Sequence, residues 1–224
     1  MQLDAVVLDV DGTLVDSVYL HVAAWVSAFD DVGVAVPAYS IHRAIGMGGD
    51  RLVAEVAGDA VERAVGDDVR ARHAHHFEQG FSHVKPLDGA AELMTLLRQR
   101  GVSVTVASSG EREQTDRLLD LVEGADAIQE RVSGSDADRS KPAPDLIDEA
   151  LERAQGSRAL CVGDAVWDVV SAGKAGVPCV GVLTGGISAG ELLEAGALAV
   201  VATPRELVER FDEIQEKALL QQLG

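Results

Sequence analysis

The apolar positions form short continuous runs that alternate with stretches of helical periodicity. Apolar runs occur at 5–8, 102–107, 159–162, 178–182 and 198–201, and helical patterns cover 18–31, 90–100, 111–121, 143–154, 166–175 and 188–195. Continuous apolar strands separated by helices are typical of a parallel sheet that helices cover on both faces. The pattern therefore predicts the α/β class with a doubly wound parallel sheet.

The segment after the first strand has a different pattern. From Pro37 to Gly80, strand-like runs give way to short helical patterns separated by Gly46, Gly48, Gly49, Gly58 and Gly66. We predict that residues 1–15 and 84–224 form the core of the protein. Residues 16–83 are predicted to form a helical domain inserted after the first strand.

Length and composition agree with this division. The chain has 224 residues, of which 47% are hydrophobic, and this is enough for a sizeable core and a smaller attached domain. No apolar run approaches the roughly 18 residues of a membrane span, and the first residues lack a basic leader pattern. Cys161 and Cys179 lie in apolar runs and resemble buried hydrophobic residues. We expect a soluble cytoplasmic protein.

The formal net charge of -18 limits the partners. Nucleic acids and anionic membranes require a basic surface, so we expect neither as a partner. The acidic surface is explained by solubility or salt adaptation and identifies no substrate. We expect a monomer or a weak homodimer whose partner is a small molecule.

The first candidate for chemistry follows the strand at 5–8. Asp9 and Asp11 lie two residues apart where this apolar run ends, and Gly12 allows the backbone to turn. Alternate residues of an extended segment point the same way, so both carboxylates can face one pocket. Two adjacent acids repel each other and resist burial unless a cation, most simply a divalent metal, relieves them. The stretch is therefore interpreted as a site.

Ser108 and Ser109 follow the strand at 102–107, directly before a helix. A hydroxyl and the N–H groups of a helix N-terminus suit a phosphate, although an ordinary serine cap would look the same. Lys141 stands between Ser140 and the prolines Pro142 and Pro144, which restrict its backbone. Such a lysine is interpreted as one presented to an anion or to neighbouring carboxylates.

Asp164 and Asp168 follow the strand at 159–162, and their spacing of one helical turn lets both reach the same pocket. Alternatively, Asp164 would cap the helix and Asp168 would be an acid of its first turn. The combination of all these residues resembles the haloacid dehalogenase-like hydrolases. The motifs of that family match Asp9-x-Asp11-Gly12-Thr13, Ser108, Lys141 and Gly163-Asp164-x3-Asp168.

The resemblance covers essentially the whole chain, and the helical insert resembles the small cap of the β-phosphoglucomutase and phosphoglycolate phosphatase branch. It implies that Asp9 is the nucleophile, forming an aspartyl-phosphate, and that Asp11 is the general acid and base. Mg²⁺ would be held by Asp9, the Asp11 main-chain carbonyl and Asp164. Ser108, Ser109 and Lys141 would bind the phosphoryl oxygens, and Asp168, Gly12 and Thr13 would support the site.

The insert would choose the substrate, because every phosphomonoester presents the same phosphoryl group to the core. Arg43, Gly46 and Met47 belong to a glycine-rich bend that resembles the cap loop of this branch, and Arg43 could bind a second anionic group. Arg43 could equally be a surface residue of a turn. His21 resembles a pocket residue of the first cap helix, or forms a packing pair with Trp25.

His73, His75 and His76 lie near Arg70 and Arg72, so their helix is interpreted as solvated, without zinc. The chain is predicted to be a Mg²⁺-dependent phosphatase of a small phosphorylated metabolite, such as a sugar phosphate or phosphoglycolate. A sugar-phosphate mutase is the alternative, although Thr13 and Gly163 favour the phosphatase. A non-catalytic binding protein on the same scaffold is the alternative of another class, and the complete set of acids argues against it.

Overall fold

The computed structural model describes residues 2–137 and 139–223. Within these residues, parallel strands form one six-stranded sheet in the order β3-β2-β1-β4-β5-β6. The strands are β1 (Ala5–Leu8), β2 (Ser103–Ala107), β3 (Ile128–Val132), β4 (Ala159–Gly163), β5 (Cys179–Val182) and β6 (Ala199–Val201). The order runs outward in both directions from β1, as a doubly wound fold requires. The predicted fold class is confirmed.

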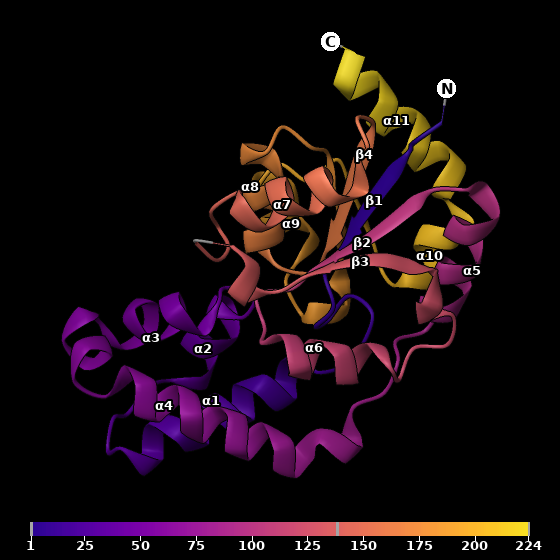
Figure 1. Ribbon diagram of the computed structural model, residues 1–224. Coiled ribbons are helices and arrows are strands. Elements are labelled where there is room, and N and C mark those ends of the chain that lie inside the picture. The colour runs from indigo at the N-terminus through magenta and orange to yellow at the C-terminus, as the bar shows by residue number, and fades with distance from the viewer. Residues whose placement is uncertain (1, 138, 224) are drawn as a thin grey trace.

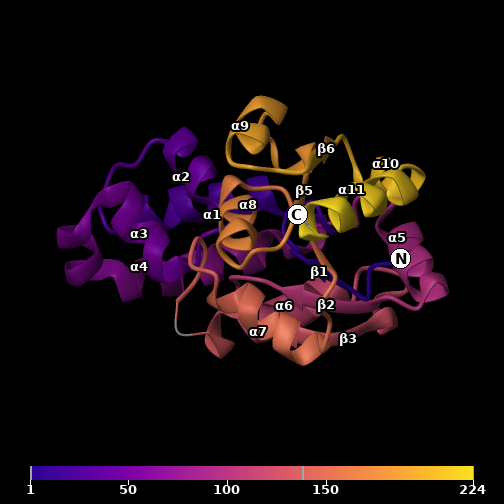
Figure 2. The ribbon, with the colours of Figure 1, turned by 90° about the horizontal axis from the view of Figure 1, so that it is seen from above.

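Helices cover both faces of the sheet because its strands are apolar on both sides. One face packs against α5 (Ala90–Arg100), α6 (Arg112–Leu119), α10 (Pro204–Glu209) and α11 (Phe211–Leu223). The other face packs against α7 (Asp145–Ala154), α8 (Val166–Lys174) and α9 (Ala189–Glu194). In β1, Val6 and Leu8 face the first group of helices and Ala5 and Val7 the second (Figures 1 and 2).

Helices α1 (Val18–Asp31), α2 (Ala38–Ala44), α3 (Gly49–Ala57) and α4 (Asp59–Gly80) follow β1, and we call them the helical insert. They share a hydrophobic cluster of their own, which includes Trp25, Phe29 and Leu52. Figure 1 shows the insert beside the sheet, on the side where β1 ends. A domain boundary at residues 16 and 83 remains a prediction.

The structure departs from the predicted elements at three places. Strand β3 and helices α10 and α11 were not predicted. Gly66 lies inside α4, which continues from Asp59 to Gly80, so it does not separate two helices as predicted.

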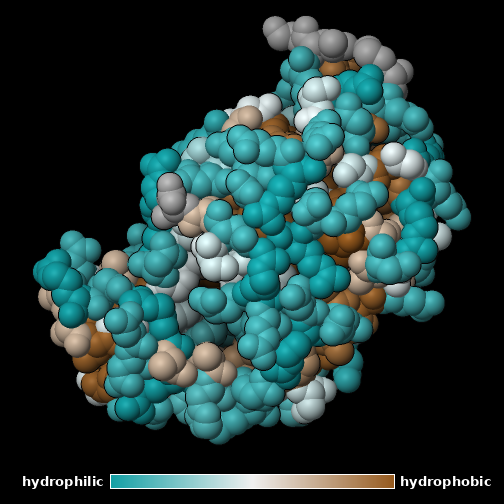
Figure 3. Space-filling model, in the orientation of Figure 1, coloured by the Kyte–Doolittle hydropathy of each residue, from teal (hydrophilic) through white to brown (hydrophobic). Residues whose placement is uncertain are grey.

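The surface in Figure 3 is mostly hydrophilic, in keeping with the high charge of the chain. No helix within the described residues has the length and apolar character to cross a membrane.

Candidate active site

Asp9 continues the line of β1 into the site. Its backbone N–H donates to the carbonyl of Val162 at 2.9 Å, so the sheet itself fixes the position of this carboxylate. The chain then turns at Gly12, whose φ is +75°. A Cβ atom at Gly12 would lie 2.5 Å from Oδ2 of Asp164, so a side chain at this position would displace that carboxylate. The turn thus leaves room for an acid from a second strand end.

Lys141 is the buried cation of the site, with 1% of its side chain exposed. Its Nζ lies 2.6 Å from Asp9 and 2.7 Å from Asp168, and donates to the carbonyl of Ala107 at 2.9 Å. Burial alone would lower the pKa of Lys141, but the charges of Asp168 and Asp9 outweigh it and hold this pKa above its ordinary value. The ammonium group therefore stays charged and fixes both carboxylates.

Among the described residues, the carboxylates of Asp9, Asp164 and Asp168 converge with oxygen atoms within 4.8 Å of one another. Burial, only partly offset by Lys141, raises the pKa of Asp9 to about 7. Burial and the charges of Asp168 and Asp9 also raise the pKa of Asp164 well above its ordinary value. The cluster thus holds more negative charge than Lys141 balances, which a further cation would relieve.

The surroundings of Asp164 fit a hard metal ion. All the converging donors are oxygen atoms, the ligands that Mg²⁺ prefers. Thr13 Oγ1 donates to Asp164 at 3.4 Å and orients it. A Cβ atom at Gly185 would lie 1.7 Å from Oδ2 of Asp164, so a glycine is needed where this oxygen approaches the backbone. The residues present therefore suit Mg²⁺ chemically.

The side chain of Asp11 points away from this cluster toward the helical insert. It accepts a hydrogen bond from Ser17 and lies 3.0 Å from Nε2 of His21. Burial alone would raise the pKa of Asp11, but His21 and Ser17 outweigh it and lower this pKa. Ser17 is the N-cap residue of α1, but its hydroxyl binds Asp11 and makes no capping bond.

The hydroxyl groups after β2 also reach the site. Ser108 is buried, and its Oγ accepts from the N–H of Gly110 at 3.1 Å. Ser109 Oγ donates to the carbonyl of Gly46 at 3.0 Å and joins the core to the helical insert. The residue before α6 is Glu111, so Ser108 is not its N-cap. The phosphate role of both serines stays a prediction.

The alternative of a simple helix cap also fails for Asp164. The N-cap of α8 is Ala165, whose N–H donates to Oδ2 of Asp168 at 3.0 Å. Asp168 thus helps to begin the helix while its other oxygen faces Lys141. Asp164 has no part in the cap and points toward Thr13 and Asp9.

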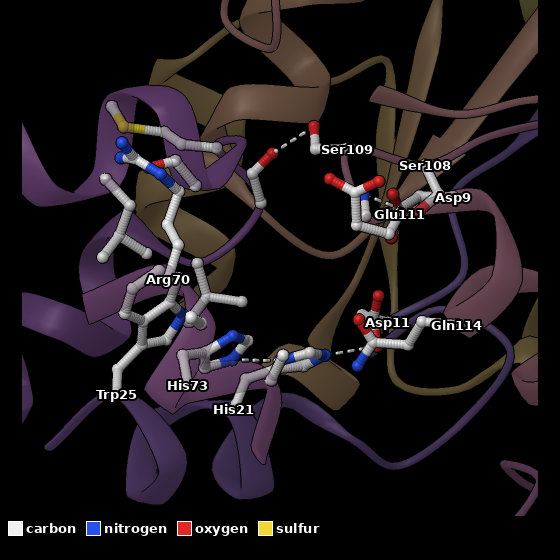
Figure 4. Close-up of a pocket in the computed structure, with 18 residues that line it drawn as sticks. Asp9, Asp11, His21, Trp25, Arg70, His73, Ser108, Ser109, Glu111 and Gln114 are labelled. Atoms are coloured by element: carbon white, nitrogen blue, oxygen red, sulfur yellow. Dashed lines mark hydrogen bonds and ion pairs between the residues drawn. The ribbon is translucent and has the colours of Figure 1, made fainter. Parts of the chain in front are cut away.

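A cavity of about 330 Å³ lies between the strand ends and the helical insert, and we call it the substrate cavity. Figure 4 shows Asp9 and Asp11 on its core side and Trp25, Arg70 and His73 on its insert side. Of the residues predicted for specificity, His21, Gly46 and Met47 line it. Ser108, Ser109, Glu111 and Gln114 complete the core side.

Arg43 does not line the substrate cavity. Its guanidinium pairs with Glu191 at 2.6 Å, its side chain is 60% exposed, and its carbonyl accepts from Trp167 Nε1 at 2.8 Å. The last turn of α2 directs this arginine toward α9, so the structure does not bring Arg43 to Asp9. It lines a separate hollow beside Trp167 and Ile187.

Sequence reasoning missed four cavity residues of α4, which are Arg70, Ala71, His73 and Ala74. Its interpretation of this helix as solvated is wrong at Arg70 and His73, which line the cavity. His73 stacks on Trp25 with ring centroids 4.0 Å apart, and its Nε2 lies 3.0 Å from Nδ1 of His21. The sequence could have predicted their position, because the spacing of Arg70 and His73 puts both on the same helix face as Phe77, an apolar residue that is buried.

Comparisons with known proteins agree with this geometry. Residues 3–176 match the family model of the haloacid dehalogenase-like hydrolases. A phosphoglycolate phosphatase from Rhodospirillum rubrum is 30% identical over 207 residues, which cover 88% of this chain and 86% of the relative.

Solved structures show the same fold. A hydrolase from Pseudomonas syringae superposes with a TM-score of 0.88 at 32% identity, covering 94% of this chain and 98% of the other. A β-phosphoglucomutase from Clostridium difficile superposes with a TM-score of 0.85, covering 99% of this chain and 100% of the other. Its identity is 16%, so this second likeness concerns the fold alone.

Proposed function

The chain belongs to the haloacid dehalogenase-like hydrolase family, and from this premise we propose that it hydrolyses a small phosphorylated metabolite through an aspartyl-phosphate on Asp9, with Mg²⁺ as cofactor. It is a phosphatase that is similar to the phosphoglycolate phosphatases of this family. The observation that carries the proposal is the pair of acids at the end of β1. Asp9 belongs to the buried acid cluster, whereas Asp11 faces His21, and both line one cavity.

The different surroundings of the two acids suit different steps. A carboxylate oxygen of Asp9 attacks phosphorus, the bond from phosphorus to the ester oxygen breaks, and Asp11 gives a proton to the leaving alcohol. Asp11 has to take up that proton first, and His21 orients it from 3.0 Å. In the second step Asp11 accepts a proton from water, whose oxygen attacks phosphorus. Phosphate leaves and the Asp9 carboxylate is restored.

The other residues hold charge and position. Lys141 keeps Asp9 and Asp168 in place, and with Ser108 and Ser109 it stabilises the phosphoryl oxygens as charge moves. Asp9, Asp164 and the main-chain carbonyl of Asp11 would hold Mg²⁺, which would neutralise part of the charge of the phosphate.

Asp9→Asn tests the proposed function. Because the substitution removes the nucleophile and nearly preserves volume, turnover of an aryl phosphate should fall by about 10⁴-fold or more while the fold persists. Acid quenching with a ³²P-labelled substrate should trap phosphoprotein in the unchanged enzyme and none in the variant. Asp88→Asn is the matched control, because Asp88 pairs with Arg205 at the surface and should not matter. Near-normal turnover by Asp9→Asn would overturn the assignment.

The acceptor separates hydrolysis from the mutase alternative. Water as acceptor releases inorganic phosphate in step with substrate loss, whereas a second substrate hydroxyl gives an isomeric sugar phosphate without net release. We propose water. The two products are counted in the same reaction by phosphate assay and by ³¹P NMR, and conversion of a hexose 1-phosphate to its 6-phosphate without phosphate release would favour the mutase.

A further inference from the structure

We propose that the alcohol released by this enzyme is uncharged and presents an apolar face, so that esters with a second anionic group are poor substrates. The inference rests on the proposed phosphatase function and names the substrate class of the same site. It comes from the insert side of the substrate cavity, where the leaving alcohol has to lie when its phosphoryl group meets Asp9.

The wall that the helical insert contributes is mainly apolar and aromatic. Its apolar and aromatic members, which come from α1, the bend after α2, α3 and α4, are Trp25, Ile45, Met47, Leu52, Ala71 and Ala74. Figure 4 shows Trp25 and His73 side by side on this wall, opposite Asp11 and Gln114. Such a surface stabilises carbon faces of a ligand and offers an anion no compensation for lost water.

Arg70 is the cation on this wall, and its charge is already balanced. Its guanidinium donates to both oxygens of Glu62 at 2.9 Å, to Asp67 at 2.7 Å and to the carbonyl of Gly49 at 3.0 Å. Two carboxylates and a carbonyl thus occupy most of the donors that a second phosphate or a carboxylate would need. A cavity-lining arginine in this arrangement is a structural residue.

The histidines do not supply a free cation either. Nε2 of His21 faces the carboxylate of Asp11 at 3.0 Å, so a proton there would already have its partner. Burial and the neighbouring His21 lower the pKa of His73 well below its ordinary value, which keeps its ring neutral. Within the part of the chain that the structure describes, every basic side chain lining this cavity is therefore paired or uncharged.

The core side adds negative charge near the opening. Glu111, the residue before α6, lines the cavity with an exposed side chain and forms no ion pair with any residue that the structure describes. A substrate with a second anionic group would lose water against the apolar wall and meet Glu111 as a like charge. An uncharged alcohol incurs neither cost.

A matched pair of esters tests the proposal on the unchanged enzyme with Mg²⁺. Phosphoglycolate and 2-hydroxyethyl phosphate have the same chain length and differ in whether a carboxylate or a hydroxymethyl group follows the ester carbon. Each is measured as a substrate and as a competitor of 4-nitrophenyl phosphate, so that a poor substrate still gives an inhibition constant. We expect 2-hydroxyethyl phosphate to be favoured at least tenfold in kcat/KM, or in the inhibition constant if neither is turned over.

The outcomes separate the two proposals. Equal values for the pair, or a preference for phosphoglycolate, overturn the uncharged-alcohol proposal while the phosphatase stands. Absence of Asp9-dependent turnover of 4-nitrophenyl phosphate overturns the proposed function instead. A hexose 1-phosphate and the hexose 1,6-bisphosphate repeat the comparison at larger size, and we expect the bisphosphate to be the poorer of the two.

Glu62→Gln tests whether the balanced charge of Arg70 causes the preference for the uncharged ester. The substitution keeps the size of the side chain and removes one of the charges that balance Arg70, so the preference for 2-hydroxyethyl phosphate should fall about threefold to tenfold. Glu78→Gln is the matched control on the same helix, because Glu78 pairs with Arg117 outside the cavity. Equal changes in both variants would show that the balanced charge of Arg70 has no part in the selection.

Discussion

The two sides of the substrate cavity differ in how their charges are arranged. On the core side, Asp9, Asp164 and Asp168 converge around a single lysine, and negative charge is in excess. On the side of the helical insert, Arg70 is balanced by acids and the remaining wall is largely apolar. The core side thus carries an excess of negative charge, whereas the charges on the insert side are balanced.

This difference suits the core side to the reaction and the insert side to the choice of substrate. A site that has to bind a cation and a phosphate keeps unbalanced charge, because binding removes the repulsion. A wall that has to choose an alcohol works by shape, apolar contact and the rejection of unpaired charge. Substitutions on the core side should therefore alter stability, metal binding and turnover, whereas those on the insert side should alter the choice of substrate.

Lys141→Met should have the largest effect on the fold. It leaves Asp9, Asp164 and Asp168 buried without their counter-charge, and breaking a buried ion pair in this way costs about 3–5 kcal/mol of the free energy of unfolding. Urea unfolding of the metal-free protein, followed by circular dichroism, measures the loss.

Lys174→Met is the control for that experiment. Its side chain is exposed, and among the residues that the structure describes its ammonium group donates to the carbonyl of Pro142 alone, so its removal should leave the unfolding midpoint nearly unchanged. Added Mg²⁺ should restore part of the stability of Lys141→Met, because a cation again balances the acids. Similar midpoints for the two variants would refute the charge imbalance described for the core.

Asp164→Ala should come next and act on metal binding. The carboxylate would be a direct ligand, and even partners of ligands commonly change metal affinity 10–100-fold, so the Mg²⁺ concentration for half-maximal activity should rise at least about tenfold. Titration of activity with Mg²⁺ measures this rise, with Asp88→Asn as the surface control. An unchanged Mg²⁺ requirement would remove Asp164 from the metal site.

The core side of the cavity was open to prediction because its acids follow the apolar strands directly. Parallel strands end at one edge, so Asp9, Ser108 and Asp164 had to meet there. Strand β3 escaped because it lies at the sheet edge, where only Ile128 and Val132 at its ends are buried and Glu130 and Arg131 are not. An edge strand with charged positions lacks the continuous apolar run from which the other strands were predicted.

The insert side could not be predicted to the same degree. Whether an arginine of a helix faces the cavity or solvent depends on how that helix packs, and the spacing of charges alone does not decide it. The sequence left open whether Arg43 reaches the site or lies at the surface, and it placed Arg70 in solvent. The direction of α2 sends Arg43 to Glu191 at the surface, and the face of α4 sends Arg70 to the cavity wall. The predicted break between helices at Gly66 was wrong because packing of α4 on α1 and α3 overrides the low helix propensity of glycine.

Arg43→Ala is expected to have the smallest effect, and it tests where the insert side of the cavity ends. Because Arg43 pairs with Glu191 at the exposed junction of α2 and α9, its removal should change kcat/KM by no more than about twofold for both 2-hydroxyethyl phosphate and 4-nitrophenyl phosphate. Arg117→Ala, which breaks a comparable exposed pair with Glu78, is the matched control. A tenfold loss confined to the metabolite-like ester would mean that Arg43 leaves Glu191 and reaches the substrate. In that case the apolar wall would have a free cation within reach, and phosphoglycolate should become the better of the two matched esters.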